Sequence, residues 1–309
     1  MKVLFLGGNG MISSACAREL VRAGHDLTIF TRTTGTDVHD PAALRTALGD
    51  RDFDVVVNFV GYKPDHISAD TETFAGRTGQ YVFISTASVY ARPIALLPIT
   101  ESTPRRNNGF PYPQDKIACE EVLEQAYREF DFPATIVRPA HTYDETVVPM
   151  LGGWTLIERM RQGKPVVVHG DGTSLWALTH SSDFARAFVP LLGNSHTLGD
   201  SVHITSDEVL TWDQIHQIMA RAAGVTPKLV HRSSEDIGVE IPDWAAVLVH
   251  DFAHTLLFDN TKLRRFVPGF AARIPFDAGA REIVAYHDAD PARRKINADL
   301  DAAFDRLSS

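Results

Sequence analysis

A glycine-rich loop directly behind a short apolar run constrains the fold of this chain more than any other feature of its sequence. Val3-Leu4-Phe5-Leu6 is wholly apolar, as expected of a strand that is buried on both faces of a parallel sheet. The loop Gly7-Gly8-Asn9-Gly10 follows, and a helix is predicted over residues 12–23. This order lets a pyrophosphate group approach the helix N-terminus over bare backbone. The loop therefore predicts dinucleotide binding; the alternative is an ordinary strand-to-helix turn.

Strand and helix patterns alternate along the first half of the chain. Such alternation favours an α/β fold with a right-handed, doubly wound parallel sheet. We expect strands at residues 3–6, 25–30, 54–60, 81–84 and 134–137, and helices at residues 12–23, 41–48, 65–77 and about 114–130.

The second half of the chain is less regular and is predicted to be mainly helical. No internal repeat, low-complexity tract or composition break marks a linker. We expect a dinucleotide-binding domain over residues 1–150 and a smaller substrate-binding region over residues 151–309, partly packed back onto the first domain.

Composition narrows the class of protein. The chain has 309 residues, 44% of them hydrophobic, and a formal charge of −9, which disfavours a general nucleic-acid or anionic-membrane surface. Cys16 and Cys119 lie far apart, so a disulfide framework is not expected. The apolar run before Gly7 is too short for a signal peptide or a membrane span. The expected location is the cytoplasm, and the expected partner is a small molecule rather than nucleic acid or membrane.

The end of the second predicted strand bears on which dinucleotide binds. An Asp or Glu there would accept hydrogen bonds from the adenosine ribose of NAD, but this chain has Phe30-Thr31-Arg32. An Arg can stack on the adenine and pair with the ribose phosphate of NADP. We therefore expect NADP, with NAD as the alternative if Arg32 only points into solvent.

Two further motifs follow the fourth predicted strand. One is Ser85-Thr86-Ala87-Ser88-Val89-Tyr90 at the end of the strand at residues 81–84, and the other is Tyr112-Pro113-Gln114-Asp115-Lys116 at the start of a predicted helix. With the glycine loop and Ile136-Val137-Arg138-Pro139, they resemble the extended short-chain dehydrogenase/reductase superfamily, the NAD(P)-dependent nucleotide-sugar epimerases and dehydratases. Asp171-Gly172 and His180-x-x-Asp183 look like a further element of that family.

The resemblance implies a Rossmann-like fold and assigns roles to residues. Thr86, Tyr112 and Lys116 occupy the catalytic positions. A neighbouring ammonium and the positive nicotinamide ring favour the phenolate, so the tyrosine can exchange a proton with a substrate hydroxyl while hydride passes to or from the nicotinamide. The expected cofactor-binding residues are Gly7, Gly10, Met11, Ile12, Arg32, Asp37, Val38, Lys116 and Pro139, and weaker substrate candidates are Ser88, His141 and Trp176.

The chain also departs from the family pattern. Ser13 stands where a third glycine is usual, Ala91 follows Val89-Tyr90 where Gly is usual, and Thr86-Ala87-Ser88 lacks the acidic pair of the dehydratases. The short connection between Val60 and Val82 resembles an atypical branch that includes chloroplast stem-loop RNA-binding proteins.

The leading prediction is an NADP(H)-dependent oxidoreductase or epimerase acting on a hydroxyl/carbonyl pair of a nucleotide-sugar. The alternatives are a reductase of a non-nucleotide carbonyl compound and a non-catalytic dinucleotide-sensing or RNA-binding protein on the same fold. A helix-to-helix homodimer is common in the family. His250 and His254 have the i, i+4 spacing of a metal pair, but no third ligand is evident, so we expect no metal.

Overall fold

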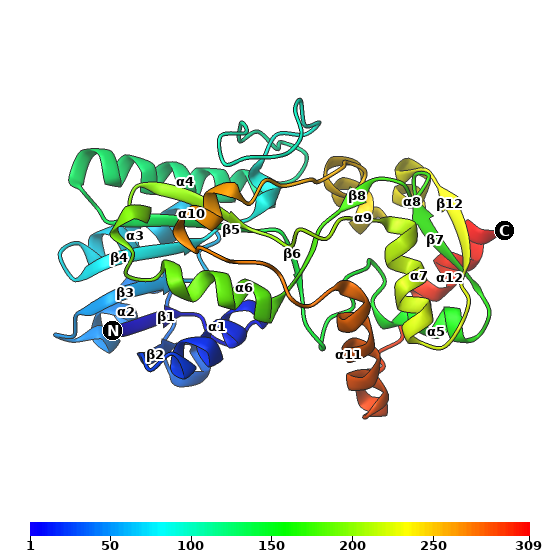
Figure 1. Cartoon of the computed structure of the whole chain (residues 1–309), viewed down its shortest axis with the longest axis horizontal. Helices are drawn as coiled ribbons and strands as arrows, with labels where there is room; N and C mark the ends of the chain where they lie inside the picture. Colours follow the sequence, from blue (N-terminus) through cyan, green and yellow to red (C-terminus); the bar gives the residue numbers. More distant parts are fainter.

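Six parallel strands form the central sheet of the molecule. The computed structural model describes all residues from Met1 to Ser309. The strand order is β2-β1-β3-β4-β5-β10, so the direction of winding reverses between β1 and β3 (Figure 1). The predicted doubly wound, Rossmann-like sheet is confirmed. The strands are β1 Lys2–Leu6, β2 Asp26–Phe30, β3 Phe53–Asn58, β4 Thr78–Ile84, β5 Ala134–Pro139 and β10 Asp200–Ile204.

Helices cover both faces of this sheet, and alternate residues of β1 show it. Val3 and Phe5 belong to one apolar core and Leu4 and Leu6 to the other, and all four are fully buried. The first face carries α1 (Met11–Arg22), α6 (Ser181–Phe188) and α10 (Thr261–Phe266), and the second carries α2 (Pro41–Leu48), α3 (Pro64–Phe74) and α4 (Pro111–Phe130).

The chain leaves this layered lobe after β5 and returns to it twice. The return of residues 181–204 supplies α6 and the edge strand β10, which pairs in parallel with β5. Segment 260–270 then packs Leu263 and Phe270 into the first of the two cores. Residues on both sides of position 150 therefore share one hydrophobic core.

A second, smaller lobe contains the rest of the chain and the C-terminus (Figure 1). Its own core is rich in aromatic side chains, including Trp154, Trp176, Trp212 and Phe252. Its strands are β6 His141–Tyr143 with β9 Leu178–His180, β7 Pro165–His169 with β12 Lys228–Arg232, and β8 Leu175–Trp176 with β11 Leu210–Thr211. Its helices are α5 Trp154–Arg161, α7 Trp212–Ala222, α8 Ser234–Glu240, α9 Pro242–Val247, α11 Phe276–Asp288 and α12 Ala298–Ser308, with a π-helix at Leu248–Phe252. Short 3₁₀ turns occur at Arg32–Thr34, Ala87–Val89, Val189–Leu191, Ser195–Thr197 and Pro291–Arg293.

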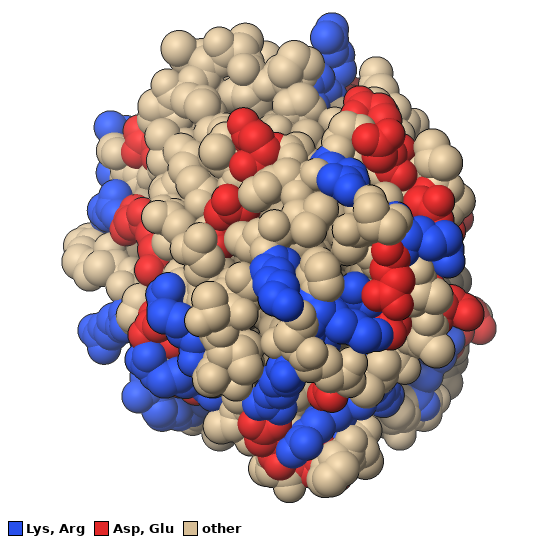
Figure 2. Space-filling model, turned by 90° about the vertical axis from the view of Figure 1, so that its right-hand side faces the viewer, with Lys and Arg blue, Asp and Glu red and all other residues tan.

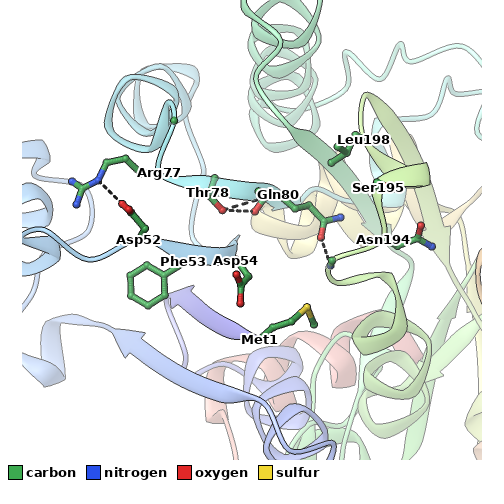
Figure 3. Close-up of a pocket in the computed structure, with 13 residues that line it drawn as sticks. Met1, Asp52, Phe53, Asp54, Arg77, Thr78, Gln80, Asn194, Ser195 and Leu198 are labelled. Atoms are coloured by element: carbon green, nitrogen blue, oxygen red, sulfur yellow. Dashed lines mark hydrogen bonds and ion pairs between the residues drawn. The ribbon is translucent and has the colours of Figure 1, made fainter.

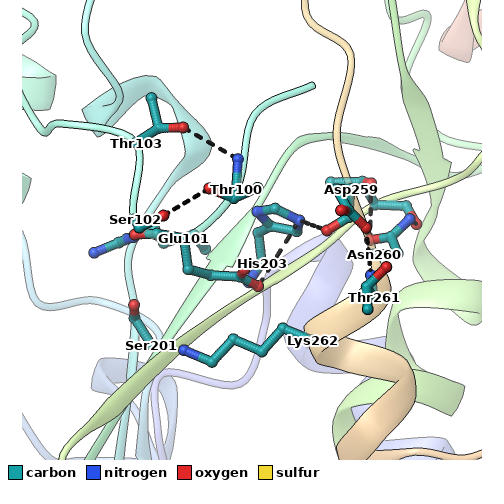
Figure 4. A network of polar contacts seen from close by, with 12 residues as sticks. Thr100, Glu101, Ser102, Thr103, Ser201, His203, Asp259, Asn260, Thr261 and Lys262 are labelled. Carbon is teal, nitrogen blue, oxygen red and sulfur yellow. Dashed lines mark hydrogen bonds and ion pairs between the residues drawn. The ribbon is translucent and has the colours of Figure 1, made fainter. Parts of the chain in front are cut away.

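A polar network fastens the returning chain to the first lobe (Figure 4). The backbone N–H of His203, on β10, donates to Glu101 at 3.1 Å, and the ring Nε2 lies 2.8 Å from the carbonyl of Asp259. Burial lowers the pKa of His203, so the ring is neutral and donates through Nε2. Its Nδ1 then accepts from the hydroxyl of Tyr90 at 3.1 Å. One imidazole thus joins three segments that are distant in sequence.

The surface of the second lobe carries charges of both signs. Figure 2, which looks onto this lobe, shows Lys and Arg side chains interspersed with Asp and Glu. Several form pairs, such as Arg161 with Asp288 at 2.7 Å and Arg306 with Glu240 at 2.7 Å. Exposed pairs of this kind contribute little to stability individually. None of the helices is long and apolar enough to cross a membrane.

Asp70, a buried carboxyl on α3, gives the fold a pH dependence that can be measured. It accepts hydrogen bonds from Asn58 at 2.7 Å and from the Tyr81 hydroxyl at 2.5 Å, and burial raises its pKa to about 7. The folded protein therefore holds this proton more tightly than the unfolded chain. The resulting stabilisation is complete below about pH 4 and is lost as the pH rises through about 7, at up to ~1.4 kcal/mol per unit.

Asp70→Asn should remove this loss, so the free energy of unfolding should fall less between pH 5 and pH 8 than in the wild type. Urea unfolding at several pH values measures this free energy in both proteins. Glu72→Gln, at an exposed position of the same helix, is the control and should keep the wild-type slope. An unchanged slope in Asp70→Asn would contradict the assignment.

Candidate active site

A groove of about 540 Å³ runs along the carboxyl ends of β1, β2 and β3. This is where open α/β sheets bind ligands, at the point where the winding direction reverses. Seven of the predicted cofactor residues line it together: Gly7, Gly10, Met11, Ile12, Arg32, Asp37 and Val38. Sequence reasoning missed several other lining residues, among them Asn9, Thr33, His39, Val60 and Tyr62.

The glycines are required by close packing around the loop. Gly7 has φ +81°, and a Cβ there would lie 2.5 Å from Cγ1 of Val60. A Cβ at Gly8 would collide with the side chain of Ile29. At the missing third glycine, the Ser13 hydroxyl donates to the carbonyl of Gly10 and accepts from its N–H, both at 3.0 Å. Ser13 therefore caps α1 and leaves the helix start open to the groove.

The end of β2 forms the outer wall of the groove. Thr31 caps a short 3₁₀ turn by accepting from the N–H of Thr34 at 3.1 Å, and Thr33 accepts from Asn9 at 2.9 Å. Arg32 is exposed on this turn. His39 follows the Asp37-Val38 pair, and its Nε2 lies 2.8 Å from the carbonyl of Val60. Its ring stacks on that of His66. No motif in the sequence identifies this histidine as a groove residue.

Thr86 and Tyr112 lie close together beyond the inner end of the groove. Thr86 follows β4 and accepts a hydrogen bond from the N–H of Ser88 at 3.2 Å. Tyr112 is in the first turn of α4, and 43% of its surface is exposed. Desolvation raises the pKa of Tyr112, a hydrogen bond with Thr86 acts against this shift, and the nearby Asp251 charge adds to it. The phenol is therefore protonated at neutral pH and accessible.

Lys116 lies one helical turn further along α4 and is buried. Its ammonium group donates to the carbonyls of Gly61 and Ile84, both at 2.8 Å, and lies 6.0 Å from the ring centre of Tyr112. Burial lowers the pKa of Lys116 to about 8, so most of the population carries the charge at pH 7. The lysine thus joins the loop after β3 to the end of β4 and places a positive charge near the phenol.

A smaller pocket of about 160 Å³ adjoins Thr86 and brings together the three weaker substrate candidates. Pro139, which we expected among the cofactor residues, lines this pocket rather than the groove. Sequence reasoning missed Asp251, Phe252 and Leu256, which the second lobe also contributes. The lining residues are Thr86, Ala87, Ser88, Pro139, Ala140, His141, Trp176, Asp251, Phe252 and Leu256.

His141 is a fixed neutral donor in this pocket. The indole N–H of Trp176 donates to its Nδ1 at 2.9 Å, and burial lowers the pKa of His141 to about 4. Because Nδ1 accepts, Nε2 carries the hydrogen. The ring can therefore donate to a substrate oxygen over the whole physiological pH range.

Asp251 enters the same pocket from the π-helix of the second lobe. The sequence drew attention here only to His250 and His254, but the helix ends at Phe252, so these two histidines do not share an α-helical face. No group of three or more His, Cys, Asp or Glu side chains is placed to hold a metal ion. A lone Asp in an irregular segment carries no signal that could have marked Asp251 as a pocket residue.

A third, more open groove of about 740 Å³ lies at the opposite, amino ends of β1, β3 and β4 (Figure 3). Its buried polar side chain, Gln80, forms hydrogen bonds within the protein. The amide donates to Thr135 and Thr197 at 3.0 and 2.9 Å, and its oxygen accepts from the N–H of Gly193 at 2.7 Å. This arrangement stabilises the sheet edge and uses the amide N–H donors of Gln80 within the protein.

Comparison with known proteins agrees with this geometry. Residues 3–204 match the model of the NAD dependent epimerase/dehydratase family. The chain belongs to that family, and it is an NAD(P)-dependent enzyme of the short-chain dehydrogenase/reductase type. Both expectations from the sequence are confirmed.

Individual relatives are distant. The chain is 26% identical to 2'-dehydrokanamycin reductase of Streptomyces kanamyceticus over 88% of its length and 81% of that protein. It is 25% identical to the chloroplast stem-loop binding protein of 41 kDa b of Arabidopsis thaliana, over 76% of this chain and 67% of that one. The UDP-glucose 4-epimerase of Thermotoga maritima superposes with a TM-score of 0.76 at 17% identity, covering 94% of this chain and 99% of that one, which shows a shared fold.

Gly7→Ala should deform the groove, because the new Cβ meets Val60 and the left-handed backbone strains any side chain by about 1–2 kcal/mol. We expect NAD(P)H affinity to fall at least about tenfold, measured by fluorescence titration. Gly24→Ala is the matched control, since its φ is +80° but a Cβ there meets nothing within 4 Å. Equal loss of affinity in both variants would show that backbone strain alone is responsible.

Proposed function

We propose that this chain is an NADP(H)-dependent oxidoreductase that interconverts a hydroxyl and a carbonyl group on a sugar-like ring. The observation that carries the proposal is that neighbouring residues at the end of β4 line the two cavities. Ile84 lines the dinucleotide groove, and Thr86, two residues further along the same strand end, lines the small pocket beside Tyr112. A reacting carbon in that pocket would lie between the phenol and a nicotinamide in the groove.

Each residue of this arrangement has a chemical role in the proposal. When bound, the nicotinamide supplies or accepts the hydride. Tyr112 gives its proton to the carbonyl oxygen during reduction and takes it back during oxidation. Thr86 donates a hydrogen bond to the same oxygen. The charge on Lys116 stabilises the phenolate, and the raised pKa of Tyr112 favours the proton-donating direction.

The cofactor preference also belongs to this proposal. Arg32 is exposed on the turn that follows β2, where its guanidinium is free to meet a ribose phosphate. The wall of the groove provides no acidic residue at the end of this strand, because Thr31 and Thr33 flank the arginine. This pattern supports NADP over NAD.

The pocket favours the non-nucleotide alternative over a nucleotide-sugar. A nucleotide diphosphate needs cationic partners, but the pocket is lined by aromatic rings and a carboxylate, and the nearby Arg92 is already paired with Asp251. The reductase relative, whose name gives 2'-dehydrokanamycin as its substrate, also matches over 88% of the chain. A ring ketone without a nucleotide therefore fits the site best.

Tyr112→Phe should lower kcat about 10²- to 10⁴-fold, because the variant loses the proton-transferring hydroxyl. Cofactor affinity should stay unchanged, and it is measured separately by titration. Tyr127→Phe, on the same helix, removes a hydroxyl away from the site and should keep wild-type turnover. Lys116→Met should lower both turnover and cofactor affinity. Near-wild-type turnover in Tyr112→Phe would mean that the chemistry lies elsewhere.

Arg32→Ala should weaken NADPH binding by about ten- to a hundredfold, the range expected for a lost hydrogen bond to a charged group, and leave NADH binding nearly unchanged. Fluorescence titration with both cofactors tests this. Arg22→Ala, an exposed arginine at the end of α1, is the control and should change neither affinity. A wild type that binds NADH as tightly as NADPH would refute the role of Arg32.

A further inference from the structure

One charged side chain of the pocket comes from outside the segment that the family model covers. Asp251 lies on the π-helix of the second lobe and is 5% exposed. Its Oδ1 accepts from Arg92 Nη2 at 2.9 Å and Nε at 3.3 Å, and its Oδ2 accepts from the Ser88 hydroxyl at 2.9 Å. A buried carboxylate needs such partners, because desolvating an unpaired charge is costly.

The partners of Asp251 do not occupy all of the hydrogen-bond acceptor sites of its carboxylate. A carboxylate has about four acceptor sites, and two donors from Arg92 and one from Ser88 leave one free on Oδ2. The remaining donors of Arg92 are directed away, since Nη1 binds the carbonyls of Tyr90 and Ala91 at 2.9 and 3.3 Å. Arg92 therefore fixes the carboxylate in place, and Asp251 and Ser88 present the polar atoms to the pocket.

The rest of the pocket suits one carbohydrate ring. Trp176, Phe252 and Leu256 supply apolar surface for the C–H face of a ring, and the neutral His141 supplies a donor. The volume of about 160 Å³ matches a single ring rather than a nucleotide. An acceptor beside apolar walls selects a ligand that carries a hydrogen-bond donor at that point.

We propose that Asp251 binds a hydrogen-bond donor, either a hydroxyl or an ammonium group, on the ring carbon next to the reacting carbon of an unphosphorylated sugar or cyclitol. The position next to the reacting carbon rests on the proposed function, because Tyr112 and Thr86 define where reaction occurs. The contact of Asp251 with Ser88, two residues from Thr86, gives the spacing.

A purely structural role for the Arg92–Asp251 pair makes a different prediction. The pair joins the first lobe to the second, so its loss could lower stability without changing which ligand binds. The test therefore compares ligands within each variant. Asp301→Asn is the matched control, because Asp301 pairs with the buried Arg159 elsewhere in the second lobe.

The experiment measures binding of D-glucosamine, D-glucose and cyclohexanol to the NADP⁺-bound protein by quenching of tryptophan fluorescence. These rings carry a neighbouring ammonium group, a neighbouring hydroxyl group or no neighbouring donor. We expect both sugars to bind at least about tenfold more tightly than cyclohexanol in the wild type and in Asp301→Asn. Asp251→Asn should remove most of this difference and leave cyclohexanol binding unchanged.

The two donor types give different results. A larger loss for glucosamine than for glucose in Asp251→Asn identifies an ammonium ligand, and an equal loss identifies a hydroxyl. Ser88→Ala keeps the Arg92–Asp251 pair and should reduce the difference about threefold, so the proposal stays testable if Asp251→Asn unfolds. A wild type without preference for the sugars, or variants that keep the preference, would overturn the proposal.

Turnover assays separate this inference from the proposed function. If no ring alcohol or ketone is turned over with NADP(H) but sugar binding depends on Asp251, the proposed function fails and the binding role of Asp251 stands. If rings are turned over and their selection is unchanged in Asp251→Asn and Ser88→Ala, the inference fails and the proposed function stands.

Discussion

The geometry of the site depends on one buried carboxylate, Glu120, in the middle of α4. Arg138 at the end of β5 donates to both of its oxygens at 2.9 and 2.7 Å, and Arg105 donates to it at 2.7 Å. Burial alone would raise the pKa of Glu120, but the hydrogen bonds and charge of Arg138 hold it below its ordinary value. A buried ion pair offsets the cost of desolvating its charges only when hydrogen bonds of good geometry satisfy both partners, as they do here. The cluster therefore fixes the rotation of α4, which decides where Tyr112 and Lys116 point.

The same constraint extends from Glu120 to the cofactor groove. Lys116 is four residues before Glu120 and so lies on the same face of α4, towards the sheet. Its ammonium group has no carboxylate partner, and it bonds instead to the carbonyl of Gly61, in the loop after β3, and to that of Ile84 at the end of β4. Residues after β3 and at the end of β4 line the groove, and Thr86, two residues beyond β4, lines the small pocket. The ion pairs of Glu120 with Arg138 and Arg105 thus position the helix that carries Tyr112 and Lys116 beside both cavities.

Local motifs explain which parts of this site could be predicted from the sequence. The loop Gly7–Gly10 and the pair Tyr112 and Lys116 depend on short spacings, so their placement follows once strand and helix are recognised. The sequence predicted only that a small side chain at Ser13 would fit, and not that its hydroxyl bonds to both the N–H and the carbonyl of Gly10. His39 and Asp251 had no such signal. Asp251 meets Ser88 and Arg92 from 163 and 159 residues away, and only the second lobe's return to the first brings them together.

The family match ends at residue 204, so it covers the groove, the catalytic positions and β10 but not the π-helix. The hydride step that we propose beside Tyr112 uses residues of the matched part. The ring selection that we propose uses Asp251, Phe252 and Leu256, which lie beyond it. Because Arg92 in the first lobe fixes Asp251 in the second, the unmatched segment is nevertheless held in register with the catalytic strand end. Substrate choice can therefore change within this fold without any change at Tyr112 or Lys116.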